Sequence, residues 1–185
     1  MIETRRARSW AHLQELLFDE PWPNKAGTYH SNLVHRGMCV STWSLETSLQ
    51  RLRLEDLEQN LVGNFRKYAQ LPGSTPPSPW EWLAIAQHHG LPTRLLDWTY
   101  SPYVALHFAT DDSRWNRQDG VVWSLDFVQL HAGLPREIRQ ELERRRSMAF
   151  DVNLLQGVFP EPSFDDLRDW ALVFEPPSID QRVVN

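Results

Sequence analysis

Residues 87–97 have the sequence QHHGLPTRLLD, which places two histidines, a glycine, a proline, an arginine and an aspartate within eleven positions. The earlier Ser78-Pro79 has the residue types of a helix cap and a first helical turn, so we expect a helix over Trp80–His89 that ends at Gly90. After Gly90 we expect an extended segment, Thr93–Leu96, with alternate side chains on opposite faces. Few purely structural loops need this mixture of residues, so the block is the first candidate for a functional site.

A second helix is predicted directly after this block. Ser101-Pro102 again combines a cap residue with a first-turn proline. The apolar stripe behind it consists of Val104, Ala105, Phe108 and Ala109. Because the amino end of a helix attracts anions, we expect a phosphate to fit between this end and an arginine.

Apolar periodicity predicts the remaining elements. Further helices are expected at Ser9–Phe18, Leu52–Ala69 and Pro135–Arg145, and strands at Leu33–Arg36, Gly120–Phe127 and Trp170–Phe174. Proline and glycine predict loops at Asp19–Thr28 and Leu71–Pro79. The order shows no repeat and no linker, which predicts one domain over residues 1–185, with residues 1–30 as a helical extension. The expected fold class is α/β (α+β), with a small central mixed sheet flanked by helices.

The composition sets the broad class of protein. The chain has 185 residues, 41% hydrophobic and 23% charged, which is enough apolar mass for one folded core. Its net charge of −5 argues against a general attraction to nucleic acid, and we interpret Arg144–Arg146, which follows several glutamates, as a solvated mixed-charge face. The single Cys39 cannot form an internal disulfide. A membrane span needs about 18 consecutive apolar residues, and no stretch of the sequence is that long. We therefore expect a cytoplasmic protein that does not enter a membrane.

Arg36-Gly37 is the second candidate for chemistry. A guanidinium at a strand end offers a planar donor fork to an anion, and glycine lets a ligand approach the backbone. The alternative is an arginine that pairs with a structural carboxylate. We predict that Arg36 lies in one cleft with Arg94 and Asp97, because a shared site would explain both charged blocks. Cys39 is a candidate nucleophile, although no neighbouring base is visible in the sequence.

The His88-His89 pair is a poor metal site, because adjacent helical positions point about 100° apart, and no metal is expected. We predict that one imidazole faces the cleft and the other packs against the protein. The alternative is an imidazole at the helix end that bonds to a backbone carbonyl.

Three blocks together resemble the FRG domain family: His35-Arg36-Gly37 with Trp43–Leu49, then residues 87–99, then Ser101-Pro102 with Ala105 and Phe108-Ala109. The resemblance runs from Leu33 to Asn185 and is strongest in the middle block. The family is named for an aromatic-Arg-Gly triplet, and this chain has His35 in the aromatic place.

The order of the blocks is also similar to the layout of ADP-ribosyltransferases, which implies an NAD-dependent enzyme of a bacterial toxin or phage-defence type. By this resemblance NAD is the co-substrate, and its binding residues would be Arg36, Gly37, Thr99, Ser101 and Tyr103. The catalytic residues would be Arg36, His88, Arg94, Asp97 and Glu175. Glu175 takes the place of a late carboxylate that orients the ribose, unless that residue falls beyond Asn185.

Two other functions stay open. A non-catalytic ligand- or partner-binding regulatory module would use Arg36, Arg94 and Asp97 as a buried ion network that joins the blocks. Another enzyme, such as a nuclease or hydrolase, would use the histidine pair. The sequence does not specify whether an acceptor is a protein or a nucleic acid.

The end of the chain carries a further expectation. In the family, a segment like Phe174–Asn185 runs on into an apolar strand, so we expect that a family-like part after residue 185 is missing. An open sheet edge invites pairing, and a homodimer or a partner protein is the expected cover. Residues after about Pro177 are then expected to be poorly packed or held by that partner, with weak NAD binding.

Overall fold

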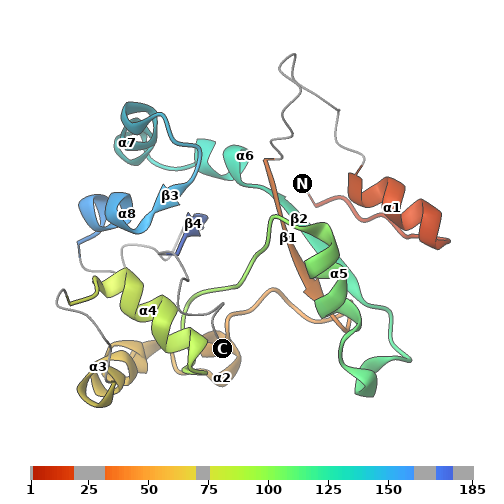
Figure 1. Cartoon of the computed structure of the whole chain (residues 1–185), viewed down its shortest axis with the longest axis horizontal. Helices are drawn as coiled ribbons and strands as arrows, with labels where there is room; N and C mark the ends of the chain where they lie inside the picture. Colours follow the sequence, from red (N-terminus) through yellow and green to blue (C-terminus); the bar gives the residue numbers. More distant parts are fainter. Residues whose placement is uncertain (1, 19–31, 70–75, 161–169, 177–185) are drawn as a thin grey trace. The chain divides into compact units, whose positions relative to one another are not determined.

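The computed structural model describes residues 2–18, 32–69, 76–160 and 170–176. Their contacts form two compact units (Figure 1). The first unit comprises Met1–Ser41 and Trp98–Leu125, and the second comprises Thr42–Asp97 and Asp126–Asn185. The predicted mixed α/β class is confirmed, but the single central sheet is replaced, in the described ranges, by two sheets of two strands each.

The first unit is built on strands β1 (Leu33–Met38) and β2 (Val121–Asp126), with helix α5 (Pro102–Thr110) beside β1 (Figure 1). Helix and strand touch through their backbones at Gly37. A Cβ atom on this glycine would lie 1.7 Å from the carbonyl oxygen of Ala105 and 2.7 Å from the amide nitrogen of Ala109. Only glycine therefore allows α5 to pack this closely on β1.

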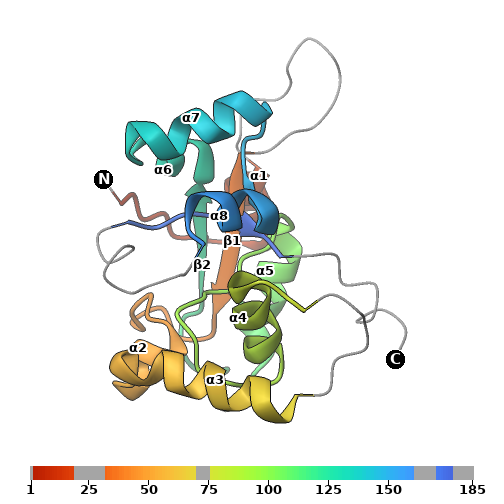
Figure 2. The same ribbon diagram turned by 90° about the vertical axis from the view of Figure 1, so that its left-hand side faces the viewer.

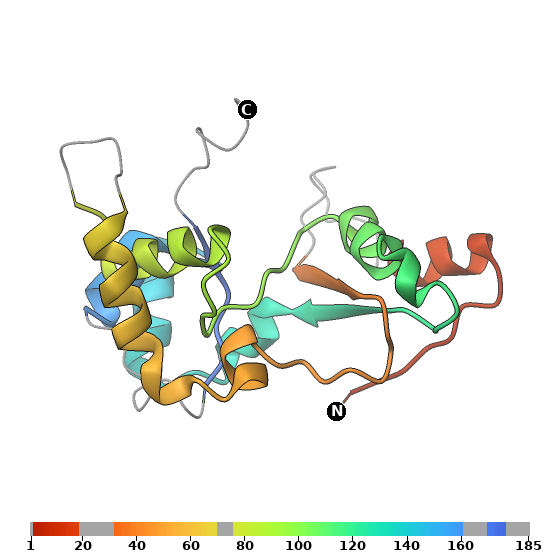
Figure 3. The same ribbon diagram turned by 90° about the horizontal axis from the view of Figure 1, so that it is seen from below.

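The two strands of the first unit run antiparallel (Figure 3). The Ser41 amide donates to the Asp119 carbonyl at one end, and the His35 ring contacts Ser124 further along, so residue numbers rise on one strand as they fall on the other. Because strand side chains alternate between faces, Arg36 lies on the face opposite to Gly37 and α5.

Helix α1 (Trp10–Phe18) completes the first unit, together with the short 3-10 helix η2 (Ser113–Trp115). The predicted cap at Ser9 is confirmed, because its Oγ accepts a hydrogen bond from the His12 amide at 3.2 Å. Phe18 packs on the ring of Tyr103 with centroids 5.3 Å apart, which attaches α1 to α5.

The second unit is mainly helical. Its elements are α2 (Ser48–Leu52), η1 (Glu55–Leu57), α3 (Glu58–Tyr68), α4 (Pro79–His88), α6 (Phe127–Ala132), α7 (Arg136–Arg145), β3 (Phe150–Asp151), α8 (Val152–Val158) and β4 (Phe174–Glu175). Helix α4 contacts α3 on one side and α8 on the other, and α8 also contacts α7 (Figure 2). Strands β3 and β4 pair in parallel.

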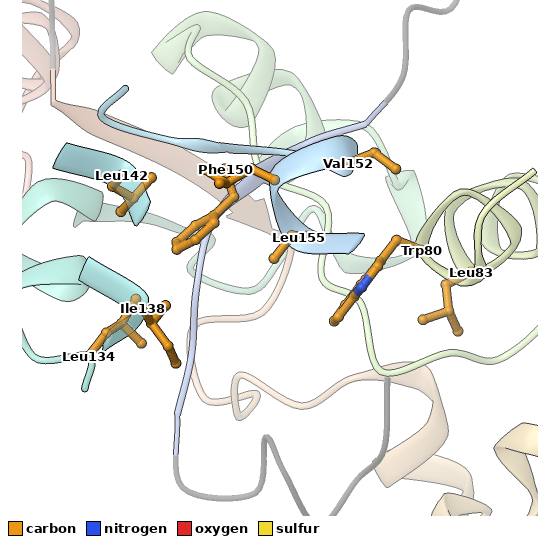
Figure 4. Close-up of a cluster of buried hydrophobic side chains, with 9 residues drawn as sticks. Trp80, Leu83, Leu134, Ile138, Leu142, Phe150, Val152 and Leu155 are labelled. Carbon is orange, nitrogen blue, oxygen red and sulfur yellow. The ribbon is translucent and has the colours of Figure 1, made fainter. Parts of the chain in front are cut away.

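One apolar cluster forms the core of this unit (Figure 4). It gathers side chains from α4, α7, β3, α8 and the turn before α7, namely Trp80, Leu83, Leu134, Ile138, Leu142, Phe150, Val152, Leu154 and Leu155. Trp80 is 2% exposed, and its indole nitrogen donates to the carbonyl of Phe159 at 2.9 Å. The cluster therefore buries its largest side chain without leaving a polar atom unpaired.

Several predicted boundaries need correction. The single helix expected over Leu52–Ala69 is divided, because Arg53 ends α2 in the left-handed conformation with φ 55°. The strand expected at Trp170–Phe174 is only the two-residue β4. The segment Thr93–Leu96 is not a strand but a loop with a bend at Arg94.

Other predictions fall outside the described residues. These are most of the loops at Asp19–Thr28 and Leu71–Pro79 and the packing after Pro177. Within the described ranges, none of the helices is long and apolar enough to cross a membrane.

Candidate functional site

The first candidate block, residues 87–97, is anchored by a buried ion pair. Both the amide and the Nε of Arg94 donate to the carboxylate of Glu58, at 2.8 and 2.5 Å, and the terminal Nη2 also contacts it. The side chains are 10% and 2% exposed. Glu58 is the first residue of α3, so the pair ties the block to that helix.

The sequence-based prediction did not name Glu58. We expected Arg94 to share a cleft with Arg36 and Asp97, which stays a prediction, and the structure adds the bonds from Arg94 to Glu58. A sequence signal for Glu58 existed, because it occupies the same helical stripe as Leu54, Leu61 and Phe65. A carboxylate in an apolar stripe needs a cation beside it, and Arg94 meets that need.

A second chain of hydrogen bonds runs through Gln87. The hydroxyl of Thr93 donates to Gln87 Oε1, and Gln87 Nε2 donates to the carboxylate of Asp97 at 2.8 Å. Thr93 is fully buried, and its amide donates to Ser48 Oγ at 3.2 Å. These bonds connect the end of α4, the following loop and α2.

The chain turns within this block as predicted. Ser78 and Glu81 form a capping box at the start of α4, with Pro79 as the first helical residue. Gly90 closes the helix with φ 84°, a conformation that favours glycine. The cap at Ser78 and the left-handed Gly90 therefore explain where α4 begins and where the chain turns after it.

The two histidines make different ring contacts. His88 and His89 are both exposed, and their rings meet edge to face with centroids 5.3 Å apart. His89 also packs on Phe65 at 5.8 Å. His89 thus packs against the protein, and the expectation that the other imidazole faces the cleft stays a prediction. Across the described residues, no group of three or more His, Cys, Asp or Glu side chains is placed to hold a metal ion.

The second unit also has a shallow apolar hollow of about 350 Å³ on α3. It is lined by Leu61, Asn64, Phe65, Tyr68, Ala69 and Leu91. It carries no charged side chain, so it is unsuited to a phosphate-bearing ligand.

The other candidate site lies in the first unit, where a backbone bridge joins two sequence blocks. The His35 amide donates to the Thr99 carbonyl at 2.7 Å, and the Thr99 amide donates back at 2.9 Å. The Ser101 amide then donates to Thr99 Oγ1 at 3.1 Å, and Ser101 Oγ caps α5 by accepting from the Val104 amide at 3.4 Å. Residues 64 positions apart in the chain, His35 and Thr99, are thereby neighbours.

His35 takes the buried place of the triplet. It is 3% exposed, and its Nδ1 lies 2.9 Å from Ser124 Oγ. Burial lowers the pKa of the imidazole below its ordinary value of 6.5, because a charged ring would lose its hydration. His35 is therefore neutral at pH 7.

Three of the predicted NAD-binding residues have structural contacts. Gly37 faces the α5 backbone, so its missing side chain accommodates a helix rather than a ligand. Ser101 caps α5, and the Tyr103 hydroxyl accepts a hydrogen bond from Gln14 Nε2 at 3.2 Å. Tyr103 nevertheless remains half exposed.

The remaining predicted residues divide between the units. Arg36 belongs to the first unit, and Arg94, Asp97 and the exposed Glu175 of β4 belong to the second. The shared cleft of Arg36, Arg94 and Asp97 therefore stays a prediction. Cys39 Sγ donates to the carbonyl of Phe108 at 3.2 Å, and its use as a nucleophile stays a prediction.

Comparison with known proteins identifies the family. Residues 31–118 match the family model described as FRG domain. This span includes β1, the 87–97 block and α5, and it ends well before Asn185, the end of the expected resemblance. No curated protein and no solved structure gives a significant match. The three sequence blocks lie inside the matched span, so residues 31–118 of this chain form an FRG domain.

Proposed function

We propose that this chain is an ADP-ribosyltransferase-like enzyme that binds NAD at β1 and the Thr99–Ser101 turn and works in the cytoplasm. The observation that carries the proposal is the backbone bridge between His35 and Thr99. The bridge makes the arginine-bearing strand a neighbour of the hydroxyl-bearing turn and of the start of α5. This is the order of parts that the resemblance to ADP-ribosyltransferases implies.

The residues at this place suit NAD in chemical type. Arg36 offers a planar fork of donors to a pyrophosphate. Thr99, which is bridged to His35 next to Arg36, adds a hydroxyl. Bound NAD would supply an activated bond between its ribose and nicotinamide. The chain's own part is to bind the pyrophosphate, to orient the ribose and to keep water away.

A carboxylate is the remaining requirement of such a transfer, because positive charge develops on the ribose carbon. Glu175 is our candidate for this role. It lies in β4 with an exposed side chain.

The proposal is tested by incubating the full chain with NAD labelled in its adenylate half, with and without cell extract. Nicotinamide release and transfer of label to protein or nucleic acid are measured. Arg36→Lys should weaken NAD binding roughly 10-fold, because lysine keeps the charge but not the planar fork, and one charge-assisted hydrogen bond contributes about 1.5 kcal/mol. Arg6→Lys is the matched control, since Arg6 is exposed and pairs with Asp119 in the same unit. Equal binding by both variants would rule out the Arg36 site.

The carboxylate is tested separately. Glu175→Gln should reduce nicotinamide release about 100-fold and leave NAD binding within a factor of about 2, as expected for a group that acts on the developing charge. Glu137→Gln in the first turn of α7 is the control.

A non-catalytic binding module is the second candidate. It is favoured by the internal use of the 87–97 block, where Arg94 bonds to Glu58, Thr93 bonds to Ser48, and Gln87 bonds to Thr93 within the block. In that case NAD or a related dinucleotide would bind, by calorimetry, with no nicotinamide release from either the wild type or Glu175→Gln. Release that depends on Glu175 would exclude it.

A further inference from the structure

His131 is an enclosed histidine that the proposed chemistry does not use. It lies in α6 of the second unit and is 4% exposed. Its ring packs edge to face against Phe127 and Phe150, with centroids 5.9 and 5.1 Å apart. An imidazole in such a place must satisfy both of its nitrogens within the protein.

Two backbone groups fix the proton on this ring. Nδ1 lies 3.0 Å from the carbonyl oxygen of Met148, which can only accept, so Nδ1 carries the hydrogen. Nε2 lies 2.9 Å from the amide of Val173, which can only donate, so Nε2 carries none. The bonds are satisfied by one neutral tautomer of His131 and by no charged form.

The second of these bonds holds the segment 170–176. Other contacts also attach it to the unit, among them the Trp170 ring, 6.5 Å from that of Phe159. Phe174 and Glu175 pair with Phe150 and Asp151, and the Phe150 amide donates to the Val173 carbonyl at 3.4 Å. Phe174 and Leu172 pack on the apolar core, with the Phe174 ring 5.8 Å from Trp80. The pairing covers only two residues, and the bond from the Val173 amide to His131 adds a polar contact before it.

Protonation of His131 would add a hydrogen to Nε2. Two donors, this N–H and the amide N–H of Val173, would then face each other. The charged side chains on the elements around the ring have other hydrogen-bond partners or are exposed. Asp126 caps α6, Asp151 caps α8, Arg139 donates to the Ala132 carbonyl, and Glu175 is exposed. Within the described ranges none of them bonds to the ring. Burial accordingly lowers the pKa of His131 from 6.5, although the Met148 carbonyl partly opposes this.

We propose that His131 is a proton-sensitive latch, which holds residues 170–176 on the second unit at neutral pH and releases them when the ring takes up a proton. Release would uncover the core surface beneath Leu172 and Phe174. It would also displace Glu175, but the latch does not depend on any catalytic role of that residue.

The latch is tested by hydrogen–deuterium exchange of the full chain, comparing the wild type with His131→Gln at each pH. A glutamine amide keeps one donor and one acceptor but does not titrate between pH 5 and 8. Comparison at equal pH cancels the intrinsic pH dependence of exchange. In the wild type, exchange of residues 170–176 should rise by up to about tenfold per pH unit below pH 6.5, relative to the variant. His107→Gln, at an exposed position in α5, is the control for loss of a histidine.

A measurement on the wild type alone decides the outcome if the variant folds poorly. Long-range proton–nitrogen NMR reports the tautomer and the titration of each imidazole. The proposal requires a proton on Nδ1 only and a pKa below 6.5, with exchange of 170–176 rising as this ring titrates. A proton on Nε2 at pH 7.5, or full protection of the segment after His131 is charged, would overturn it.

Discussion

Among the described residues, each of the two units encloses one histidine, and the two rings are held in different ways. His35 is 3% exposed and His131 is 4% exposed, and burial lowers the pKa of both. His35 bonds to the hydroxyl of Ser124, whereas His131 bonds to two backbone groups. A hydroxyl can turn to donate or to accept, but a backbone amide can only donate. The partner, rather than the depth of burial, therefore decides which histidine can change charge without losing a bond.

The frameworks around these histidines also differ. In the first unit the strand that carries His35 is fixed by close backbone contact with α5. In the second unit the segment that meets His131 is fixed by side chains and a two-residue pairing. Steric contact does not depend on pH. We therefore expect the packing of β1 on α5 to be sensitive to mutation of Gly37, and the attachment of residues 170–176 to be sensitive to protonation of His131.

The largest expected effect is at the glycine. Gly37→Ala puts a methyl group 1.7 Å from the Ala105 carbonyl oxygen, so α5 must move away from β1. We expect the free energy of unfolding to fall by about 3 kcal/mol or more, the upper range for overpacking, measured by urea denaturation. Gly63→Ala in α3 is the control, because its Cβ would meet no atom within 4 Å. It should stabilise the chain by about 0.5–1 kcal/mol.

The next effect concerns the Arg94–Glu58 pair of the second unit. Arg94→Met leaves a buried carboxylate without its cation, and we expect a loss of about 3 kcal/mol in the free energy of unfolding. The double variant Arg94→Met with Glu58→Met removes both charges and should recover most of that loss. If the single and double variants are equally destabilised, the loss does not come from an unpaired Glu58 carboxylate.

Protonation is expected to have a smaller effect on stability. The unfolded chain takes up a proton on each histidine near pH 6.5, while the folded units resist this until a lower pH. The unfolded state therefore holds more protons in that window, and stability decreases as the pH falls through it, by at most about 1.4 kcal/mol per pH unit for each group.

The two histidines should contribute unequally to this slope. His131→Gln should remove more of it than His35→Gln, because a charged His35 keeps its bond to Ser124. Urea midpoints between pH 5 and pH 7.5 provide the measurement. A larger effect from His35 would contradict the comparison between a hydroxyl partner and a backbone partner.

The elements that sequence predicts well are those with local chemical signals. The starts of α4 and α5 follow from Ser-Pro pairs, and the end of α4 follows from Gly90. Strand β1 follows from its short β-branched run. In each case the deciding atoms lie within a few residues of one another.

What the sequence could not supply was the identity of distant partners. The Glu58–Arg94 pair spans 36 positions and the His131–Val173 bond spans 42, and neither has a local pattern. The candidate block around Arg94 has an unusual composition, but its sequence does not show that Arg94 bonds to Glu58 and Thr93 to Ser48. The contact between Gly37 and α5 likewise depends on tertiary packing, since a glycine after an arginine equally suggests access for a ligand.

The smallest expected effect comes from backbone strain, which also distinguishes the units. Among the described residues, the non-glycine positions with positive φ are Arg53 and Arg146, at 55° and 53°, and both end helices of the second unit. In α4 the corresponding position is a glycine. Because a side chain disfavours the left-handed region, Arg53→Gly and Arg146→Gly should each stabilise the chain by up to about 1 kcal/mol. Arg145→Gly, one residue earlier and within α7, is the matched control and should destabilise it by about 0.5–1 kcal/mol. Opposite signs at neighbouring arginines in urea denaturation would separate backbone strain from the loss of a charge, whereas equal changes would trace the effect to the charge.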